Sequence, residues 1–265
     1  MTQPLPHELS GNKNAEEIVV FMHGWPDTTA LWDPIIAPLE KDAYILNVSY
    51  PNFSSKESNP KGISFEDLLD RLKVTIDKVN DTNRRVVMVS HDWGAMFSYW
   101  FDQRFPKYVS EIIALDIGAR SDITLFKIIY QVYLAIAFII GGPIGNFMTS
   151  LILRLFKYKP AWKDRINSSW NYPYYYIWKS ILTGRGNKNK IPFMKYEPSC
   201  NIAFVWGTKK PVHFHNDSWL RLLQKNPNNE VHSVKAAHWI MREQPAFVID
   251  LIRRRVKNLK NALPK

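Results

Sequence analysis

The chain has 265 residues, of which 46% are hydrophobic and 22% are charged, and this composition excludes a disordered or collagen-like chain. It fits one globular domain that can hold an inserted subdomain, and the single cysteine, Cys200, excludes an intramolecular disulfide or a cysteine-rich zinc site. The formal net charge of +11 would suit nucleic acid, but the sequence carries no nucleic-acid-binding motif.

Apolar, β-branched segments alternate with helical patterns along the chain, which indicates a parallel sheet with crossover helices. The sequence predicts strands over residues 18–22, 43–48, 85–90, 111–115, 202–206 and 230–234. It predicts helices over residues 30–39, 65–79, 95–104, 218–225 and 245–257. Ser64 is the predicted N-cap of the helix over 65–79, because Asp67 follows it by three residues.

The alternation is interrupted between residues 119 and 199, where the pattern is helical and rich in aromatic residues. We therefore expect a helical cap inserted into a core formed by residues 1–118 and 200–265. Residues 128–153 carry no charged side chain and are long enough to span a bilayer. Because Gly141, Gly142 and Pro143 interrupt this run, two packed helices of a soluble cap are expected. A cap that docks on a membrane is the alternative, and a membrane span is the least favoured.

The insertion also holds most of the net positive charge. Residues 120–197 carry twelve Lys or Arg against three Asp or Glu, about nine of the eleven net charges. An anionic membrane surface is the macromolecular partner that this pattern favours, and its basic residues include Lys157, Lys159, Lys163 and Arg165. No secretory signal is visible in the first twenty residues, so we expect an intracellular, reducing location, in the cytoplasm or peripheral to a membrane. The oligomeric state is left open.

The most informative segment is residues 88–100, MVSHDWGAMFSYW, in which an apolar strand leads into a predicted helix. Ser90, Asp92 and Gly94 follow the pattern small-x-nucleophile-x-small, which is typical of a strained turn that exposes a catalytic nucleophile. A carboxylate attacks amides and esters poorly, but it can open an activated sp³ carbon to give an alkyl ester. Asp92 therefore indicates epoxide opening or carbon–halogen cleavage, in preference to a simple cap of the helix that follows.

Two further motifs follow predicted strands. The turn His23-Gly24-Trp25-Pro26 can present the backbone N–H of Trp25, together with that of Trp93, to an oxyanion. His238 comes after the last predicted strand and is the candidate general base that deprotonates water. Three other histidines have no such setting and are expected at turns or on the surface: His213, His215 and His232.

The segments HGWP, SHDWGA and AHWIMREQP together resemble the signatures of the epoxide-hydrolase branch of the α/β-hydrolase superfamily, which haloalkane dehalogenases resemble closely. The similarity covers about residues 16–256. It implies an α/β-hydrolase fold, with a mostly parallel sheet, flanking helices and an inserted helical cap. It places the nucleophile on Asp92, the base on His238 and the oxyanion motif on residues 23–26, where His23 is expected to contact substrate. The implied function is a cofactor-independent hydrolase of small lipophilic epoxides.

The acid of the catalytic triad departs from the family pattern. The family usually carries it as Gly-x-x-Asp after the strand that ends near Gly207, where this sequence has Lys210. A lysine cannot accept the imidazole N–H. Some relatives place the acid at the end of the preceding core strand, so Asp116 is the candidate, with Asp217 as a weaker substitute. The short segment before the first predicted strand also indicates that the usual N-terminal strand pair is short or missing.

Cap tyrosines separate the two chemistries that the resemblance allows. Similar epoxide hydrolases use cap hydroxyls as donors to the epoxide oxygen, whereas a dehalogenase needs two N–H donors for the halide. Tyr130 and Tyr133 lie in one half of the cap and Tyr174 and Tyr175 in the other, and we expect one donor from each half. Their abundance favours the epoxide over the dehalogenase alternative. A non-catalytic binding or assembly subunit is the third alternative, because Lys210 occupies the usual acid position.

The sequence gives no indication of a metal or a cofactor. No His, Asp or Glu cluster has the spacing of a metal site. Neither a phosphate-cradling glycine-rich loop nor a dinucleotide fingerprint is present. We therefore expect chemistry carried by side chains alone.

Overall fold

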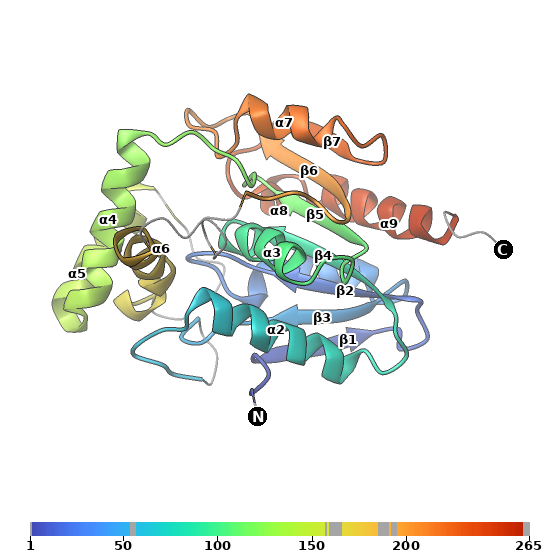
Figure 1. The fold of residues 1–265 in the computed structure, drawn as a ribbon, viewed down its shortest axis with the longest axis horizontal. Helices are drawn as coiled ribbons and strands as arrows, with labels where there is room; N and C mark the ends of the chain where they lie inside the picture. Colours follow the sequence, from blue (N-terminus) through green and yellow to red (C-terminus); the bar gives the residue numbers. More distant parts are fainter. Residues whose placement is uncertain are drawn as a thin grey trace.

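The computed structural model describes residues 2–53, 57–156, 158, 166–184, 191 and 195–261, with only the backbone described for 258–261. Within these residues, seven strands form one sheet in the order β1-β3-β2-β4-β5-β6-β7, and β1 runs antiparallel to β3 while the other pairs are parallel (Figure 1). The strands are β1 (His7–Gly11), β2 (Glu17–Met22), β3 (Tyr44–Val48), β4 (Arg85–His91), β5 (Glu111–Leu115), β6 (Asn201–Gly207) and β7 (Glu230–Val234).

The central strands are covered on both faces, which is why they appear in the sequence as continuous apolar runs. In β2 the side chains alternate between two clusters: Ile18 and Val20 pack in one, Val19 and Phe21 in the other. The first cluster includes residues of α2 (Phe65–Val79), α3 (Trp93–Arg104) and α7 (Asp217–Leu223). The second includes residues of α1 (Asp33–Ile36), α8 (Ile240–Glu243) and α9 (Pro245–Asn261). The structure is therefore a sheet between two layers of helices.

All six predicted strands are present, with ends displaced by at most one residue. The helix over 65–79 is also present, and the Oγ of Ser64 accepts the N–H of Asp67 at 3.1 Å. The predicted helix over 30–39 is three short pieces, η1 (Thr29–Trp32), α1 and η2 (Ala37–Leu39). The last two each carry a proline in their first turn, which removes the N–H that a continuous helix would need. The sequence did not predict β1, whose residues HELSG are polar and lie on the sheet edge.

Four helical segments lie beyond the carboxyl ends of the parallel strands (Figure 1), and we call them the cap helices. They are α4 (Leu125–Ile140), α5 (Gly142–Leu155), η3 (Ser168–Asn171) and α6 (Tyr172–Thr183). The uncharged run forms α4 and α5, which meet at Gly141, whose N–H caps α4 by bonding to the carbonyl of Ala137 at 3.0 Å. Among the described residues, no helix has the length and apolarity that a membrane span needs.

Candidate active site

Asp92 occupies a sharp turn between β4 and α3, with φ of 53° and ψ of −123°. A left-handed backbone at a non-glycine residue is strained and persists where the surrounding structure enforces it. The enforcing contacts come from two glycines. A Cβ on Gly94 would lie 2.3 Å from the carbonyl oxygen of Met22, and one on Gly24 would lie 2.4 Å from the Cβ of Asp92. The small residues therefore let β2, β4 and α3 approach closely enough to expose the Asp92 carboxylate.

Backbone donors also hold this carboxylate. The N–H of Trp25 donates to Asp92 Oδ1 at 2.7 Å, and the backbone N–H of Trp93 also bonds to the carboxylate. Burial raises the pKa of Asp92, but the charge and hydrogen bond of His238 and these donors outweigh burial and hold it below its usual value. Asp92 is therefore ionised at neutral pH, with Oδ2 left facing His238.

His238 lies between two carboxylates. Its Nε2 is 3.6 Å from Asp92 Oδ2, and its Nδ1–H donates to Asp116 Oδ2 at 2.6 Å. Burial lowers the pKa of His238, but the two carboxylates more than compensate and raise it to about 9. The imidazole is therefore protonated at neutral pH while Asp92 is ionised.

Asp116 is positioned by the end of β5 and is fully buried. Its φ is 73°, its N–H bonds to the carbonyl of Val205 at 2.7 Å, and its Oδ1 accepts the N–H of Gly207 at 3.1 Å. The ammonium of Lys210 lies 2.8 Å from the same Oδ1. Burial raises the pKa of Asp116, yet His238 and Lys210 together bring it below its usual value. Lys210, at the position where the family usually carries the acid, thus contacts Asp116, the candidate acid, which follows the neighbouring strand.

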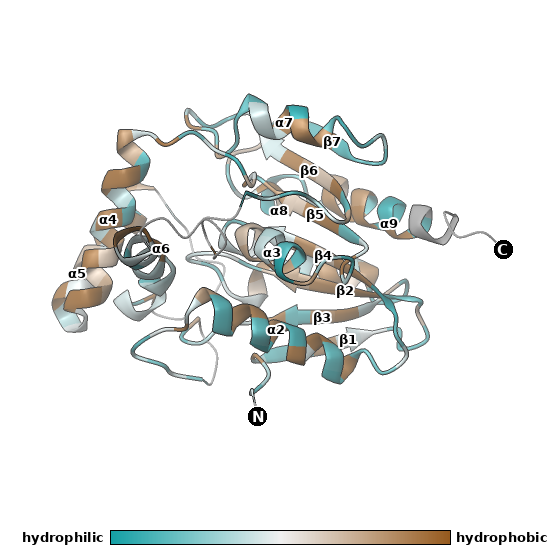
Figure 2. Cartoon of the chain, viewed as in Figure 1, coloured by the Kyte–Doolittle hydropathy of each residue, from teal (hydrophilic) through white to brown (hydrophobic). Residues whose placement is uncertain are grey.

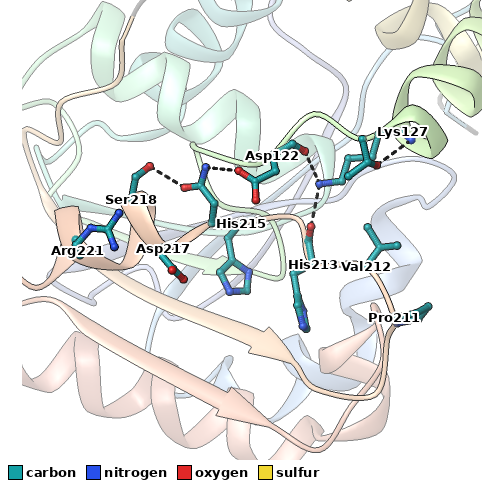
Figure 3. Close-up of a pocket in the computed structure, with 11 residues that line it drawn as sticks. Asp122, Lys127, Pro211, Val212, His213, His215, Asp217, Ser218 and Arg221 are labelled. Carbon is teal, nitrogen blue, oxygen red and sulfur yellow. Dashed lines mark hydrogen bonds between the residues drawn. The ribbon is translucent and has the colours of Figure 1, made fainter.

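Asp217, the weaker candidate for the acid, begins α7 and lines a separate polar hollow. Figure 3 shows this hollow, of about 530 Å³, which Asp217 shares with His213, His215 and Lys127. Lys127 Nζ donates there to the carbonyls of Asp122 and His213, both at 2.9 Å. Because Asp92 does not line this hollow, we do not place the chemistry in it. His232, on β7, instead bonds to Glu230 at 2.7 Å.

Two buried polar residues beside the site were not predicted from the sequence. His91 donates its Nε2–H to the carbonyl of His238 at 3.0 Å, and its pKa falls to about 3 because it is buried next to that histidine. Asp27 accepts hydrogen bonds from Tyr158 Oη at 2.8 Å and from Trp239 Nε1 at 2.9 Å. Burial raises the pKa of Asp27 to about 6. The signal that could have revealed these two residues is their position beside the recognised motifs, since Asp27 follows HGWP and His91 precedes Asp92.

Two cavities meet at Asp92. One of about 300 Å³ also contains His238 and Lys210, and the other, of about 510 Å³, contains Trp93 and extends towards α6. Both are lined mainly by apolar and aromatic side chains. Three residues besides Asp92 line both cavities, namely Tyr130, Tyr174 and Phe214. The space in front of the carboxylate thus suits a lipophilic molecule with few polar groups.

Of the four predicted cap tyrosines, one from each half lines these cavities. Tyr130 comes from α4 and Tyr174 from α6, and their ring centroids are 6.0 Å apart. Burial raises the pKa of both hydroxyls, and the Asp92 charge raises it further, so both stay protonated. Tyr133 and Tyr175 line neither cavity, and the ring of Tyr175 packs on Phe138 at 5.1 Å.

His23, the predicted substrate contact, also lines neither cavity. It is completely buried, its Nδ1–H donates to the carbonyl of Gly24 at 3.0 Å, and its ring packs on Tyr50 and Phe53. Burial lowers its pKa to about 4, so the ring is neutral. His23 thus packs beneath the cavity walls as part of the core and contacts the backbone of the turn at residues 23–26.

The indole of Trp25 ties this turn to the cap helices. Its Nε1–H donates to Asn171 Oδ1 at 2.9 Å, and Asn171 Nδ2 donates to Thr149 Oγ1 at 2.8 Å. Thr149 in turn donates to the carbonyl of Gly145 at 2.8 Å. All these side chains are buried, so a continuous chain of hydrogen bonds runs from the oxyanion turn into α5.

Among the described residues, no group of three His, Cys, Asp or Glu side chains could hold a metal ion. The groups gathered around Asp92 are a carboxylate, an imidazole, two phenols and backbone N–H donors. Such groups carry out nucleophilic and acid–base chemistry directly.

Comparison with protein families matches residues 17–138 to the model described as the alpha/beta hydrolase fold. "Epoxide hydrolase srdG" of Neurospora crassa is 28% identical over 99 residues, which cover 36% of this chain and 29% of that protein. "Epoxide hydrolase 3" of Mus musculus is 24% identical over 77% of this chain and 50% of that protein. The chain therefore matches half or less of the length of these two relatives.

Among solved structures, an epoxide hydrolase from Bacillus megaterium superposes with a TM-score of 0.71 at 19% identity, covering 96% of each chain. An esterase and a haloalkane dehalogenase are also similar in fold, so the fold alone does not select the reaction. The resemblance drawn from the motifs and the expected fold class are confirmed: the chain has the α/β-hydrolase fold.

Proposed function

Because a carboxylate stands at the nucleophile position of this α/β-hydrolase fold, we propose that the protein is a hydrolase that opens lipophilic epoxides to diols. One observation carries the proposal: the ionised carboxylate of Asp92 shares its cavities with two protonated phenols, Tyr130 and Tyr174, and with His238. A nucleophile, two hydroxyl donors and a base are the groups that epoxide hydrolysis through an ester requires.

In the first step Asp92 Oδ2 attacks one epoxide carbon, and the bond from that carbon to the ring oxygen breaks. The hydroxyls of Tyr130 and Tyr174 donate to this oxygen, and one of them supplies the proton that converts the alkoxide to an alcohol. The product is an alkyl ester of Asp92. The raised pKa of both tyrosines supports this role, because a donor must be protonated at the start of the reaction.

In the second step water hydrolyses the ester. Esterification removes the negative charge of Asp92, one of the two charges that raise the pKa of His238, so the imidazole can lose its proton and act as base. Water attacks the ester carbonyl carbon, and the negative charge on Oδ1 is met by the N–H groups of Trp25 and Trp93. The proton that His238 takes from water passes to the departing ester oxygen as the bond from this oxygen to the carbonyl carbon breaks, and the diol leaves. The proton released earlier by His238 and the proton of the new Asp92 carboxylic acid restore the tyrosine and the imidazolium.

The covalent intermediate provides the test. Exchange of His238 for Gln should stop hydrolysis but not alkylation, so the variant should gain the mass of one epoxide on the peptide that contains Asp92. Asp92→Ala should gain nothing and turn nothing over. Tyr130→Phe and Tyr174→Phe should each slow alkylation about 10²-fold, whereas Tyr133→Phe, whose hydroxyl lies outside both cavities, is the matched control. An active protein whose Asp92 never carries the adduct would refute the proposal.

A haloalkane dehalogenase on the same groups is the competing enzyme. A halide leaving group needs two N–H donors, and the indoles of Trp25 and Trp93 are the candidates. The indole of Trp25 is already bonded to Asn171, and the side chain of Trp93 bonds to Tyr174. These contacts favour the epoxide. If the protein is given a bromoalkane, the rate of bromide release should be far below the rate of diol formation from an epoxide. Release of halide with no diol formation would select the dehalogenase.

The non-catalytic alternative predicts that neither substrate is turned over and that no adduct forms. It was motivated by Lys210, but the structure provides His238 with a carboxylate partner from β5 instead. We therefore retain the enzyme as the proposed function, and the adduct experiment distinguishes the two.

A further inference from the structure

Exposed apolar side chains are concentrated on one part of the molecule. Among the described residues, fifteen large hydrophobic side chains are strongly exposed, and thirteen of them lie between Ile123 and Leu182. The thirteen are Ile123, Leu125, Phe126, Ile129, Ile136, Ile139, Ile140, Ile144, Phe147, Leu151, Leu155, Ile181 and Leu182. We call this set the cap surface. Monomeric proteins rarely expose so many large apolar side chains together without a binding partner.

The spacing of the members on α4 and α5 places most of them on helix faces. In α5 the members Ile144, Phe147, Leu151 and Leu155 follow one another by three or four residues, and in α4 the members Leu125, Ile129, Ile136 and Ile140 follow by four or seven, which keeps each series on one side of its helix. Figure 2 shows the strongly hydrophobic colour along α4 and α5, at the end of the molecule farthest from the carboxyl terminus. No described element covers these faces.

Charge identifies the kind of partner. From residue 123 to residue 163 the sequence contains no Asp or Glu, and its five charged residues are Lys127, Arg154, Lys157, Lys159 and Lys163. Lys127 is buried and hydrogen-bonded, whereas Arg154 is exposed on α5. Lys157, Lys159 and Lys163 lie outside the described residues, so only the sequence places them after α5. Asp122 and Asp164 stand just outside this stretch, so the apolar helix faces have more basic than acidic neighbours in the sequence, a balance that complements an anionic lipid surface.

The cap surface is continuous with the candidate active site. Ile123 and Ile181, two of its members, line the 510 Å³ cavity that reaches Asp92. Phe126, a third member, lines the 300 Å³ cavity. A molecule that leaves a lipid phase at these side chains would therefore meet apolar walls until it reaches the carboxylate.

We propose that the cap surface docks on an anionic lipid bilayer without spanning it, and that the substrate enters the cavity from the bilayer. The docking stands on exposure and charge alone. The substrate class, an epoxide dissolved in lipid, rests on the proposed function.

Vesicle co-sedimentation tests the docking. The protein should bind vesicles of phosphatidylcholine with phosphatidylserine, and binding should weaken as salt is raised. The double variant Ile139→Glu/Ile144→Glu changes two members that line neither cavity and are 67% and 64% exposed, and it should lower partitioning at least about tenfold. The matched control is Leu9→Glu/Val231→Glu, which changes the two strongly exposed large hydrophobic residues that the described part of the chain has outside the cap surface, and it should bind as the unchanged protein does.

Three outcomes would overturn the docking proposal: no binding to anionic vesicles at low salt, equal loss of binding in both double variants, or self-association abolished by Ile139→Glu/Ile144→Glu without any vesicle binding. The last result would identify a second copy of the chain as the occupant. Thermal melting of both variants confirms that each is folded.

The inactive Asp92→Ala protein should bind vesicles as the unchanged protein does, so a failure of the epoxide chemistry is distinguishable from a failure of docking. For substrate delivery, Ile139→Glu/Ile144→Glu should slow turnover of a long-chain epoxide embedded in vesicles and leave that of a short, water-soluble epoxide unchanged. Equal effects on the two substrates would refute delivery from the bilayer.

Discussion

Asp116 makes two ionic contacts at once. Variants of Asp116 and Lys210 therefore allow the contribution of these contacts to stability to be measured separately from their contribution to turnover. Its Oδ2 accepts the Nδ1–H of His238 at 2.6 Å, while its Oδ1 lies 2.8 Å from Lys210 Nζ. The side chains of Asp116 and Lys210 are 0% and 9% exposed. Exchange of Asp116 for Asn therefore leaves a buried ammonium ion without its counter-charge.

Removal of one partner of a buried ion pair costs about 3–5 kcal/mol, and we expect the lower end, about 3 kcal/mol, because the amide oxygen of Asn remains an acceptor. For a chain of this size that is a fall in Tm of roughly 6–12 °C. The double variant Asp116→Asn/Lys210→Met has no unpaired charge and should recover most of this loss. Turnover should fall about 10³–10⁴-fold in both variants, because neither has a carboxylate to hold His238 in its tautomer.

Thermal denaturation followed by circular dichroism, together with epoxide turnover, measures the two effects on the same samples. Lys210→Met alone is the control, and it should keep most of its activity because the bond between Asp116 and His238 remains. Recovery of activity in the double variant, or unchanged activity in Asp116→Asn, would refute the assignment of Asp116 as the orienting acid. A double variant no more stable than the single one would refute the ion-pair argument.

Three further expectations follow from the site. Gly24→Ala should lower turnover at least about tenfold, because the new Cβ would lie 2.4 Å from both Cβ and Oδ1 of Asp92; normal kinetics would show that the turn can relax. The raised pKa of Asp27, about 6 against 3.8, makes the native state lose stability as pH rises from about 4 to 7. Denaturant titrations should find that the free energy of unfolding falls by about 2–3 kcal/mol over this range, and Asp27→Asn should not show this fall. Parallel pH profiles of stability for the two proteins would contradict the raised pKa of Asp27. The rate of hydrolysis of the accumulated ester, measured by rapid quench, should rise with pH and then level off. The apparent pKa of this profile should lie below about 9, the pKa of His238 beside the ionised Asp92, because the ester carries no charge. An apparent pKa at or above 9 would contradict the loss of the Asp92 charge.

The sequence predicted the core of the sheet because its buried strands are continuous runs of β-branched and apolar residues. It did not predict β1, since HELSG is polar and is held in the sheet by pairing with β3. Asp92 and His238 were predicted because each lies in a motif with a local backbone requirement. A local sequence pattern was therefore sufficient to predict the strands and the motif residues that a single segment of the chain determines.

Features that depend on several segments were harder to predict. The choice between Asp116 and Asp217 depends on which strand end lies next to the loop that carries His238, which the order of strands in the sheet decides. Similarly, adjacent residues Tyr174 and Tyr175 differ only in the side of α6 from which they project, and the packing of α6 against α4 selects Tyr174. Tertiary contacts, not composition, settle such choices.

The hydrogen bonds from Trp25 through Asn171 to Thr149 have a mechanical consequence. A lid that swings freely over an active site must be joined to it only by contacts that break easily. Here α5 is anchored, through buried donors and acceptors, to Trp25, whose backbone N–H donates to the Asp92 carboxylate. Movement of α5 away from the turn at residues 23–26 would therefore break at least one of these buried hydrogen bonds and leave its donor or acceptor unpaired.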